Sequence, residues 1–461
     1  MNNLVNIITL LILVIFVSGC STKYIQDPTL INSLQGTDVS DHFIFIDNDG
    51  YMKDVNDKKI PEYKIKIDDI FSKFSHLKQN NPDLSMTIYI HGGLNTFSST
   101  VARVKNTYKK ILSKKQYPIF ISWKSGPFTN YLDHLFMIRQ GERSALKGLP
   151  SFPFIFAEDA LRSVARILPS SWNIVAGQNN LSIKYVNNVE EAAEKSESRI
   201  EKHTNFNVHK NMKYSSGHGF LDFVTIWNPV KFVTAPLADG FGKGAWGSML
   251  RRTDLVLNSQ KAFEGGSRED SQTAAHYFFY LLDKNHNNTR KTLIGHSMGT
   301  IIANNVLSRF PNINFNEVIY MAAACKIKDL EKSVVPWLRA DKNRNFYNLT
   351  LNPYRDINEN GYFDFVPRGS LLIWLDEFLA DVDSFEDRTA GYWFNIMRTA
   401  EVVFPPNIRN QVHLTRYGIK NISPQNHGDF DDFNFWDETF WINADKGVYP
   451  IIKNWPYENN K

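Results

Sequence analysis

The chain has 461 residues, of which 43% are hydrophobic and 22% are charged, and its formal net charge is +4. These proportions are ordinary for a globular protein, and the length suits one large α/β domain that carries insertions. The charge is spread along the chain, and no long basic block is interleaved with aromatic residues, so the composition argues against a nucleic-acid partner.

The N-terminus combines an almost entirely apolar run, residues 4–17, with the sequence Val17-Ser18-Gly19-Cys20. The run is too short to span a bilayer comfortably. It resembles a bacterial lipoprotein signal peptide, although no Lys or Arg precedes it, and an uncleaved anchor helix is the alternative. The resemblance implies cleavage before Cys20, palmitate or another acyl group on that cysteine, and attachment to a membrane of the cell envelope. Because Ser21 follows, it implies the outer membrane, facing the periplasm, in a Gram-negative host.

The first elements after the N-terminal segment are two short apolar runs. Residues 42–46 and 63–67 are predicted strands, and the second is expected to be half exposed because its apolar residues alternate. Asp47-Asn48-Asp49-Gly50 between them is predicted to be a turn. Residues 68–77 carry apolar side chains at helical spacing.

A second buried strand is predicted at residues 86–90, and it runs directly into His91-Gly92-Gly93-Leu94-Asn95. Glycines at such a position let backbone N–H groups face a substrate without an intervening Cβ atom. Residues 98–112 then read as an amphipathic helix and residues 119–123 as a strand. Strand, helix and strand in this order predict a right-handed crossover and a parallel sheet.

Residues 124–270 interrupt this alternation with a long stretch rich in aromatic residues. We expect a large, mainly helical insertion that forms a cap over the site and controls access to it. The sequence is therefore divided into five parts: a signal peptide (1–19), a tether (20–40), the N-terminal part of an α/β domain (41–123), the cap (124–270) and the C-terminal part of the domain (271–461).

The alternation resumes with a predicted helix at residues 271–283 and then the sequence Gly295-His296-Ser297-Met298-Gly299. An apolar run, residues 291–294, precedes this pentapeptide as a predicted strand, and residues 300–307 follow it as a predicted helix. A G-x-S-x-G sequence at a strand-to-helix turn is typical of a nucleophile elbow, in which the serine hydroxyl projects above the sheet. The helix N-terminus beneath it favours the anion that forms when a hydroxyl attacks a carbonyl.

These two motifs resemble those of the α/β-hydrolase superfamily, and within it the serine esterases and lipase-like members, over residues 81–455 apart from the cap. The resemblance implies an α/β fold with a mostly parallel central sheet flanked by helices. It also implies an oxyanion hole formed by the backbone N–H groups of Gly93, or Leu94, and Met298. His91, His296 and Leu94 are expected to line the substrate pocket, with His91 shaping the oxyanion loop.

A serine nucleophile needs a base and a carboxylate that orients the base, and in this superfamily they follow in the order serine, acid, histidine. Further strands are predicted at residues 317–323, 346–351 and 411–417. His427 lies in the loop after the last of these strands and is the predicted base. Asp429, Asp431 and Asp432 beside it are expected to form a solvated loop.

The predicted acid is Asp356, five residues beyond a predicted strand. Residues 356–364 also match the first half of a calcium loop, but Pro367 occupies the position of the bidentate Glu, so an EF-hand is not expected. A turn or weak cation loop remains open at this place, as do Asp376 and Asp364 as the acid.

The sequence therefore predicts a membrane-anchored serine hydrolase that cleaves carboxylic esters through an acyl-enzyme, with a lipid or other small-molecule ester as substrate. No cofactor or metal is expected. The alternatives are an acyltransferase and a non-catalytic binding or scaffolding lipoprotein built on the same fold. The sequence leaves the natural substrate, the oligomeric state and the movement of the cap open.

Overall fold

The computed structural model describes residues 38–139, 142–176, 183–203, 205–210, 230–258, 272–284, 289–359, 367–417 and 423–442. The predicted signal peptide, the acylated Cys20 and nearly all of the tether lie outside this part of the chain, as does Asp364. No helix in the described residues is long and apolar enough to cross a membrane.

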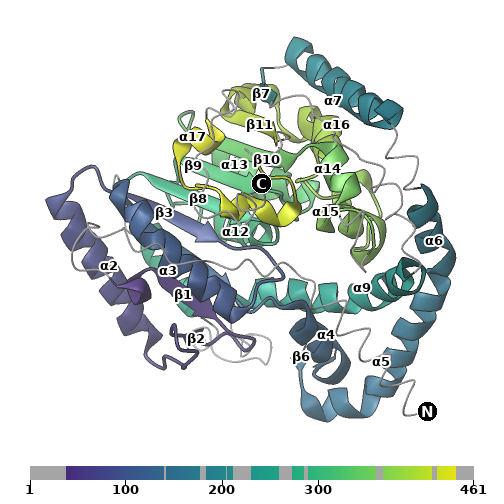
Figure 1. Cartoon of the computed structure of the whole chain (residues 1–461). Helices are drawn as coiled ribbons and strands as arrows, with labels where there is room; N and C mark the ends of the chain where they lie inside the picture. The colour runs from purple at the N-terminus through teal and green to yellow at the C-terminus, as the bar shows by residue number, and fades with distance from the viewer. Residues whose placement is uncertain are drawn as a thin grey trace, which may run out of the picture.

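A nine-stranded sheet forms the centre of the molecule, in the order β2-β1-β4-β3-β8-β9-β10-β11-β7 (Figure 1). Every neighbouring pair is parallel except β1 and β2. The strands are β1 (Phe43–Ile46), β2 (Met52–Lys53), β3 (Ser85–Ile90), β4 (Gln116–Trp123), β7 (Asn207–Lys210), β8 (Lys291–His296), β9 (Glu317–Met321), β10 (Asn345–Leu351) and β11 (Val412–Tyr417). A separate two-stranded sheet pairs β5 (Ile138–Arg139) with β6 (Glu142–Arg143).

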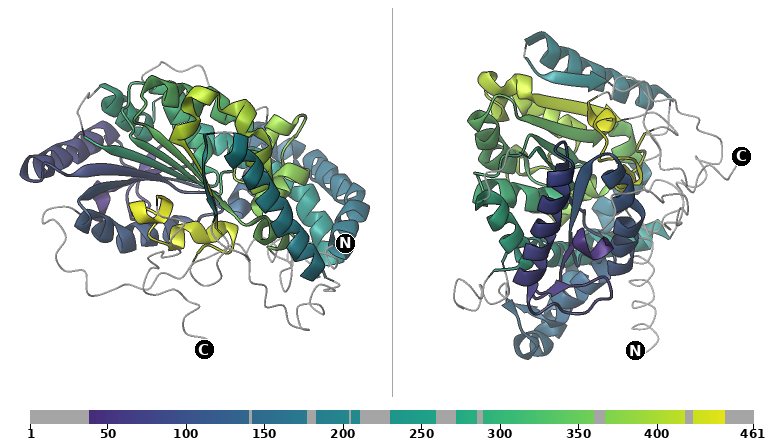
Figure 2. Two further views of the ribbon diagram at one scale, coloured as in Figure 1. Left: turned by 90° about the horizontal axis from the view of Figure 1, so that it is seen from above. Right: turned by 90° about the vertical axis from the view of Figure 1, so that its left-hand side faces the viewer.

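Helices cover both faces of the central sheet (Figure 2). The α-helices are α2 (Tyr63–Asn80), α3 (Phe97–Ser113), α4 (Pro127–Phe136), α5 (Ala145–Ala165), α6 (Ile167–Ala176), α7 (Ile183–His203), α9 (Lys231–Leu255), α11 (Ala274–Lys284), α12 (Gly299–Arg309), α13 (Ile327–Ala340), α14 (Pro353–Asn358), α15 (Leu371–Trp374), α16 (Trp393–Val403) and α17 (Glu438–Trp441). Shorter helical turns are η1 (Val39–Asp41), η3 (Leu375–Leu379), η4 (Phe385–Asp387), η5 (Pro406–Gln411) and η6 (His427–Asp432). The predicted mostly parallel α/β architecture is thereby confirmed.

The central strands are buried on both faces, which explains why their sequences are continuous apolar runs rather than alternating ones. All residues of β8 and β9 are buried, and β4 is buried over all but its first residue. Most strands predicted from such runs are therefore confirmed within a few residues.

The predicted strand at residues 63–67 is wrong, because these residues begin helix α2. The alternation that suggested a strand extends over only five residues. Ile67, Ile70 and Phe74 instead form one buried stripe at helical spacing, while Ile65 faces solvent. The predicted turn after β1 is confirmed, since the Asp47 carboxylate accepts the N–H groups of Asp49 and Tyr51.

The predicted cap region, residues 124–270, contributes to two places in the fold. Strand β7 pairs in parallel with β11 and extends the central sheet, with α7 beside α16. Helices α4, α5, α6 and α9, which we call the insertion helices, pack on one another beside the sheet, well away from α7 (Figure 1). Of these, α9 also contacts α12, the helix that follows Ser297.

Close packing of α12 on the end of β3 makes Gly299 a position that admits no side chain. A Cβ atom there would clash with the Ile90 carbonyl oxygen and lie 2.8 Å from the His91 carbonyl oxygen. We expect Gly299→Ala to lower the free energy of unfolding by about 3 kcal/mol, since backbone must move to make room. Urea unfolding measures this change.

Gly247→Ala in α9 is the matched control, because nothing lies within 4 Å of a Cβ atom at that position. It should leave stability unchanged or raise it by up to about 1 kcal/mol, since alanine favours the helix. Equal effects of the two substitutions would contradict the packing described here.

Candidate active site

Ser297 occupies a strained turn between β8 and α12. Its φ is +50°, in the left-handed region that non-glycine residues rarely adopt, and its N–H donates to the Met321 carbonyl at 2.8 Å. A Cβ atom at Gly92 would lie 2.9 Å from the Ser297 Cβ, and one at Gly295 would lie 3.1 Å from Thr300. Glycines at these positions allow the strand, the turn and the helix to meet, as a nucleophile elbow requires.

His427 approaches this serine from η6, in the segment after β11. Its Nε2 lies 2.7 Å from the Ser297 Oγ, and both side chains are buried. Burial lowers the pKa of His427 to about 3, so the ring is neutral at neutral pH. A neutral ring that accepts the serine hydroxyl at Nε2 carries its proton on Nδ1. The structure therefore brings the predicted nucleophile and the predicted base together.

The main chain of His427 is held on both sides. Its N–H donates to the Glu359 carboxylate at 2.8 Å, and its carbonyl lies 3.0 Å from the His296 Nε2. The Asp429 carboxylate accepts the N–H groups of Gln425 and Asn426 just before it. Two contacts thus hold the backbone of His427 itself, and two more hold the residues just before it.

Asp356 lies in α14, directly after β10, and is fully buried. Burial raises the pKa of its carboxyl to about 7, with a further contribution in the same direction from Asp376. The Ser370 side chain acts in the opposite direction on this pKa. Within the described residues the His427 Nδ1 has no hydrogen-bond partner, so the structure does not bring the Asp356 carboxylate into contact with the ring. The two groups are linked along the chain, because Glu359, three residues after Asp356, contacts the His427 backbone.

The carboxylate of Asp376, the alternative acid, forms hydrogen bonds with other groups. Its carboxylate accepts the Thr389 N–H at 2.8 Å and the Asn395 side-chain amide at 2.5 Å. These contacts join η3 to the segment before α16, so the charge of Asp376 is used in holding that segment.

The two predicted oxyanion donors lie close together near Ser297, since Met298 follows it in the chain and Gly93 lies against the Met298 side chain. Within the described residues, the N–H groups of Gly93 and Met298 have no protein acceptor. The Leu94 N–H, in contrast, donates to the Ser125 carbonyl at 3.1 Å, so it is occupied. A Cβ atom at Gly93 would lie 2.6 Å from the Met298 Sδ and 2.7 Å from the Met249 Cε, which shows that this loop fits tightly under α9.

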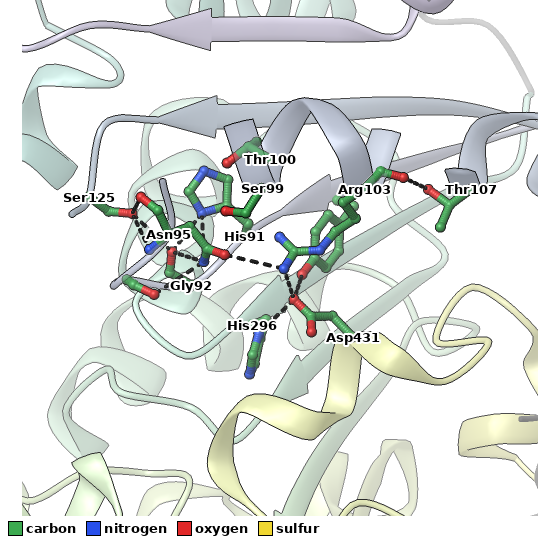
Figure 3. Close-up of polar contacts among 12 residues, drawn as sticks. His91, Gly92, Asn95, Ser99, Thr100, Arg103, Thr107, Ser125, His296 and Asp431 are labelled. Atoms are coloured by element: carbon green, nitrogen blue, oxygen red, sulfur yellow. Dashed lines mark hydrogen bonds and ion pairs between the residues drawn. The ribbon is translucent and has the colours of Figure 1, made fainter. Parts of the chain in front are cut away.

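His91 lies against this loop, beside Gly92 and Asn95 (Figure 3). Its Nδ1 lies 2.6 Å from the Gly92 carbonyl, its Nε2 accepts the Trp123 N–H, and its ring stacks on the Trp123 indole. Burial lowers the pKa of His91 to about 3, which keeps Nε2 free to accept. The Asn95 amide donates to both the Gly92 and Gly93 carbonyls at 3.1 Å, so the loop is braced from two sides.

Asp431 is a site residue that sequence reasoning missed, and the expected solvated loop is wrong at this position. The carboxylate is 2% exposed and lies 2.7 Å from an Arg103 guanidinium nitrogen. It also accepts the Tyr89 hydroxyl at 3.1 Å and lies 3.6 Å from the His296 Nδ1 (Figure 3). Burial raises its pKa, but the Arg103 charge and the neighbouring donors outweigh burial and hold the pKa well below the usual range.

Arg103 connects this carboxylate to the oxyanion loop, since it also donates to the Asn95 Oδ1 at 3.2 Å. It lies on the buried side of α3, in one stripe with Thr100 and Thr107 (Figure 3). An arginine in a stripe of otherwise uncharged residues requires a buried partner. That pattern was the one available signal in the sequence for the missed carboxylate.

The described residues contain no group of three or more His, Cys, Asp or Glu side chains that could hold a metal ion. Comparison of the chain with protein-family models, with curated proteins and with solved structures found no match. The case for function therefore rests on the geometry of the site.

Asp431→Asn tests the buried ion pair. Removal of the charge leaves Arg103 buried without its partner, and we expect a loss of about 3–5 kcal/mol in unfolding free energy at pH 7. Because the folded pKa of Asp431 is lowered, its contribution is complete above pH ~4 and is lost as the pH falls further. Urea titrations at several pH values measure both effects.

Asp381→Asn is the control, since Asp381 forms a surface ion pair with Lys243 and is 74% exposed. It should cost no more than about 1 kcal/mol. A similarly small loss for Asp431→Asn would show that the buried pair does not stabilise the fold.

Proposed function

We propose that this protein is a serine hydrolase of the α/β-hydrolase type that cleaves carboxylic esters while attached to a membrane through Cys20. The observation that carries the proposal is the 2.7 Å contact between the His427 Nε2 and the Ser297 Oγ. A serine in a strained turn, paired with a neutral histidine, has the two properties that an activated nucleophile requires.

The reaction follows from the positions of these groups. Ser297 Oγ attacks the ester carbonyl carbon as His427 Nε2 takes its proton, and the carbonyl oxygen becomes an oxyanion held by the N–H groups of Gly93 and Met298. His427 then gives the proton to the departing alcohol, which leaves an acyl group on Ser297. Water, deprotonated by the same histidine, releases the acid and restores the serine.

The sheet topology supports the α/β-hydrolase assignment. The serine follows β8 in the middle of the sheet, the candidate acid follows β10 and the histidine follows β11, which is the order typical of that superfamily. The second oxyanion donor comes from the loop between β3 and α3, as the superfamily pattern requires.

A lipid ester is the substrate class that fits the rest of the molecule best. The predicted acylation of Cys20 would hold the enzyme at a bilayer, and Met249 and Met298 place apolar side chains against the oxyanion loop. Acyl transfer to another acceptor uses the same intermediate, so product analysis decides between a hydrolase and an acyltransferase.

Labelling with a fluorophosphonate probe tests the nucleophile. Wild-type protein should be labelled at Ser297, Ser297→Ala should not be labelled, and His427→Ala should react about 100-fold or more slowly because the base is missing. Ser113→Ala and His76→Ala, at exposed positions, are the controls and should react like wild type. Detergent micelles are included as a second condition, because Ser297 is buried.

A folded wild-type protein that stays unlabelled both with and without micelles would contradict the proposal and favour the non-catalytic alternative. Labelling that persists in Ser297→Ala would place the reactive group elsewhere.

The role of Asp356 is tested by measuring both the labelling rate and the free energy of unfolding at several pH values. Because burial raises its pKa to about 7, protonation below pH 7 removes the charge that would stabilise the imidazolium. We expect the wild-type labelling rate to fall as the pH decreases through 7, and Asp356→Asn to react slowly at every pH. Asp381→Asn, which removes an exposed carboxylate that is paired with Lys243, should retain the wild-type pH profile.

Asp356 also makes the stability of the fold depend on pH. Here low pH is favourable, whereas the labelling rate is expected to be higher at high pH. A raised folded pKa means that stability is lost as the pH rises from about 4, the value of a free carboxyl, to about 7. Asp356→Asn removes this loss and should be more stable than wild type at pH 8, by on the order of 3 kcal/mol. A variant that is less stable and fully active would exclude Asp356 as the acid.

A further inference from the structure

Helices α5 and α6 carry an unusual concentration of exposed apolar side chains. Ten of the eighteen large apolar side chains exposed in the described part of the chain lie on these two helices. The most exposed are Leu146 at 89%, Leu168 at 80%, Phe154 at 79%, Leu161 at 71% and Trp172 at 70%. We call the exposed side of α5 and α6 the apolar face.

The polar residues of these helices lie mostly on the opposite side. Asp159 is buried and accepts the Tyr131 hydroxyl from α4, and Ser170 is buried in contact with Asp239 of α9. Arg166 turns inward to the same Asp239 carboxylate at 3.4 Å. Ile155 and Phe156 also face inward and pack on the cluster between α4 and α9, so α5 is apolar on both its inward and its outward side, whereas the outward side of a surface helix is usually polar.

Helices α5 and α9 approach closely at one point and pack through aromatic rings at another. A Cβ atom at Gly240 would clash with Ser163 of α5, and the centroid of the Phe156 ring of α5 lies 5.7 Å from that of the Phe241 ring of α9. Small residues and polar bridges between helices, with large apolar side chains outside, are the pattern that serves helices surrounded by lipid. In water, an exposed apolar patch of this kind promotes association between molecules, so contact with water alone does not account for the arrangement.

We propose that the apolar face lies in the interfacial layer of a lipid bilayer. The acyl site predicted at Cys20 is only 18 residues from Asp38, where the described fold begins, and this length reaches at most ~65 Å. Acylation at Cys20 would therefore confine the fold near a membrane surface. On α5 and α6, Lys147 and Arg162 equal Glu158 and Asp159 in number, so the two helices carry no net negative charge that would repel anionic lipid.

The proposal is for a helix pair that lies in the plane of the interface and does not cross the bilayer. Within the described residues no helix meets the length and hydropathy needed to span it. An amphipathic segment at an interface buries its apolar side among the acyl chains and leaves the opposite side to the protein. Membrane docking of this face does not depend on the chemistry proposed for Ser297.

The test uses the form that starts at Ser21, which keeps every described residue but has no acyl group. Its only native cysteine, Cys325, is buried, so a cysteine introduced by Leu168→Cys can be labelled selectively with an environment-sensitive dye. Vesicles of phosphatidylethanolamine and phosphatidylglycerol should shift the dye emission to the blue. The same dye at Val402→Cys, an exposed apolar position on α16, should not respond.

Substitutions measure how much the face contributes to binding. Leu161→Asp and Leu168→Asp should each weaken co-sedimentation with these vesicles by about tenfold or more, since each removes one buried leucine from the acyl layer. Val402→Asp is the matched control and should bind like the parent form. Ser297→Ala should also bind normally, which separates docking from catalysis.

A Leu168 dye that does not respond to the vesicles would overturn the proposal. So would a stable dimer whose Leu168→Asp variant becomes monomeric without any change in vesicle binding, because a second copy of the chain would then be the occupant of the face. Sedimentation velocity of both forms provides this comparison.

Discussion

The buried ion pair between Asp431 and Arg103 connects the three segments on which the site depends. Arg103 is rooted in α3 and braces the oxyanion loop through Asn95, while Asp431 belongs to the same short helix as His427. A buried carboxylate without its cation would cost several kcal/mol. Any movement of η6, which carries His427, away from β3 and α3 would therefore separate this pair and cost free energy. The 2.7 Å contact at Ser297 is one result of that constraint.

Burial acts in opposite directions on the two titratable groups that would follow the serine in a triad. It lowers the pKa of His427 to about 3 and raises that of Asp356 to about 7, because it disfavours the charged form of each. At neutral pH His427 is therefore uncharged, whereas Asp356 is divided between its protonated and ionised forms. A positive charge that came close to Asp356 would favour its ionised form, since opposite charges stabilise one another strongly in a dry site.

The sequence predicted most of the central sheet and Ser297 because both depend on local patterns, and it predicted His427 from its place in the loop after the last predicted strand. Continuous apolar runs mark strands buried on both faces, and the turn glycines around Ser297 are needed within a few residues of it. Asp431 could not be recognised in this way, since its partner is 328 positions earlier in the chain and only the fold joins them. Strand β7 was hidden for a similar reason, because four residues at a sheet edge carry little pattern of their own.

Helix α9 joins the two parts of the molecule that the sequence treated as one cap. On one side, Met249 packs against Gly93 and closes the oxyanion loop from above. On another side, Gly240 and Asp239 receive α5 and α6 through small and polar contacts, which leave the large apolar residues of those helices facing outward. The cover of the site and the apolar face are thus parts of one packed group of helices. A surface that oriented α5 and α6 would therefore also act, through α9, on the loop that carries Gly93.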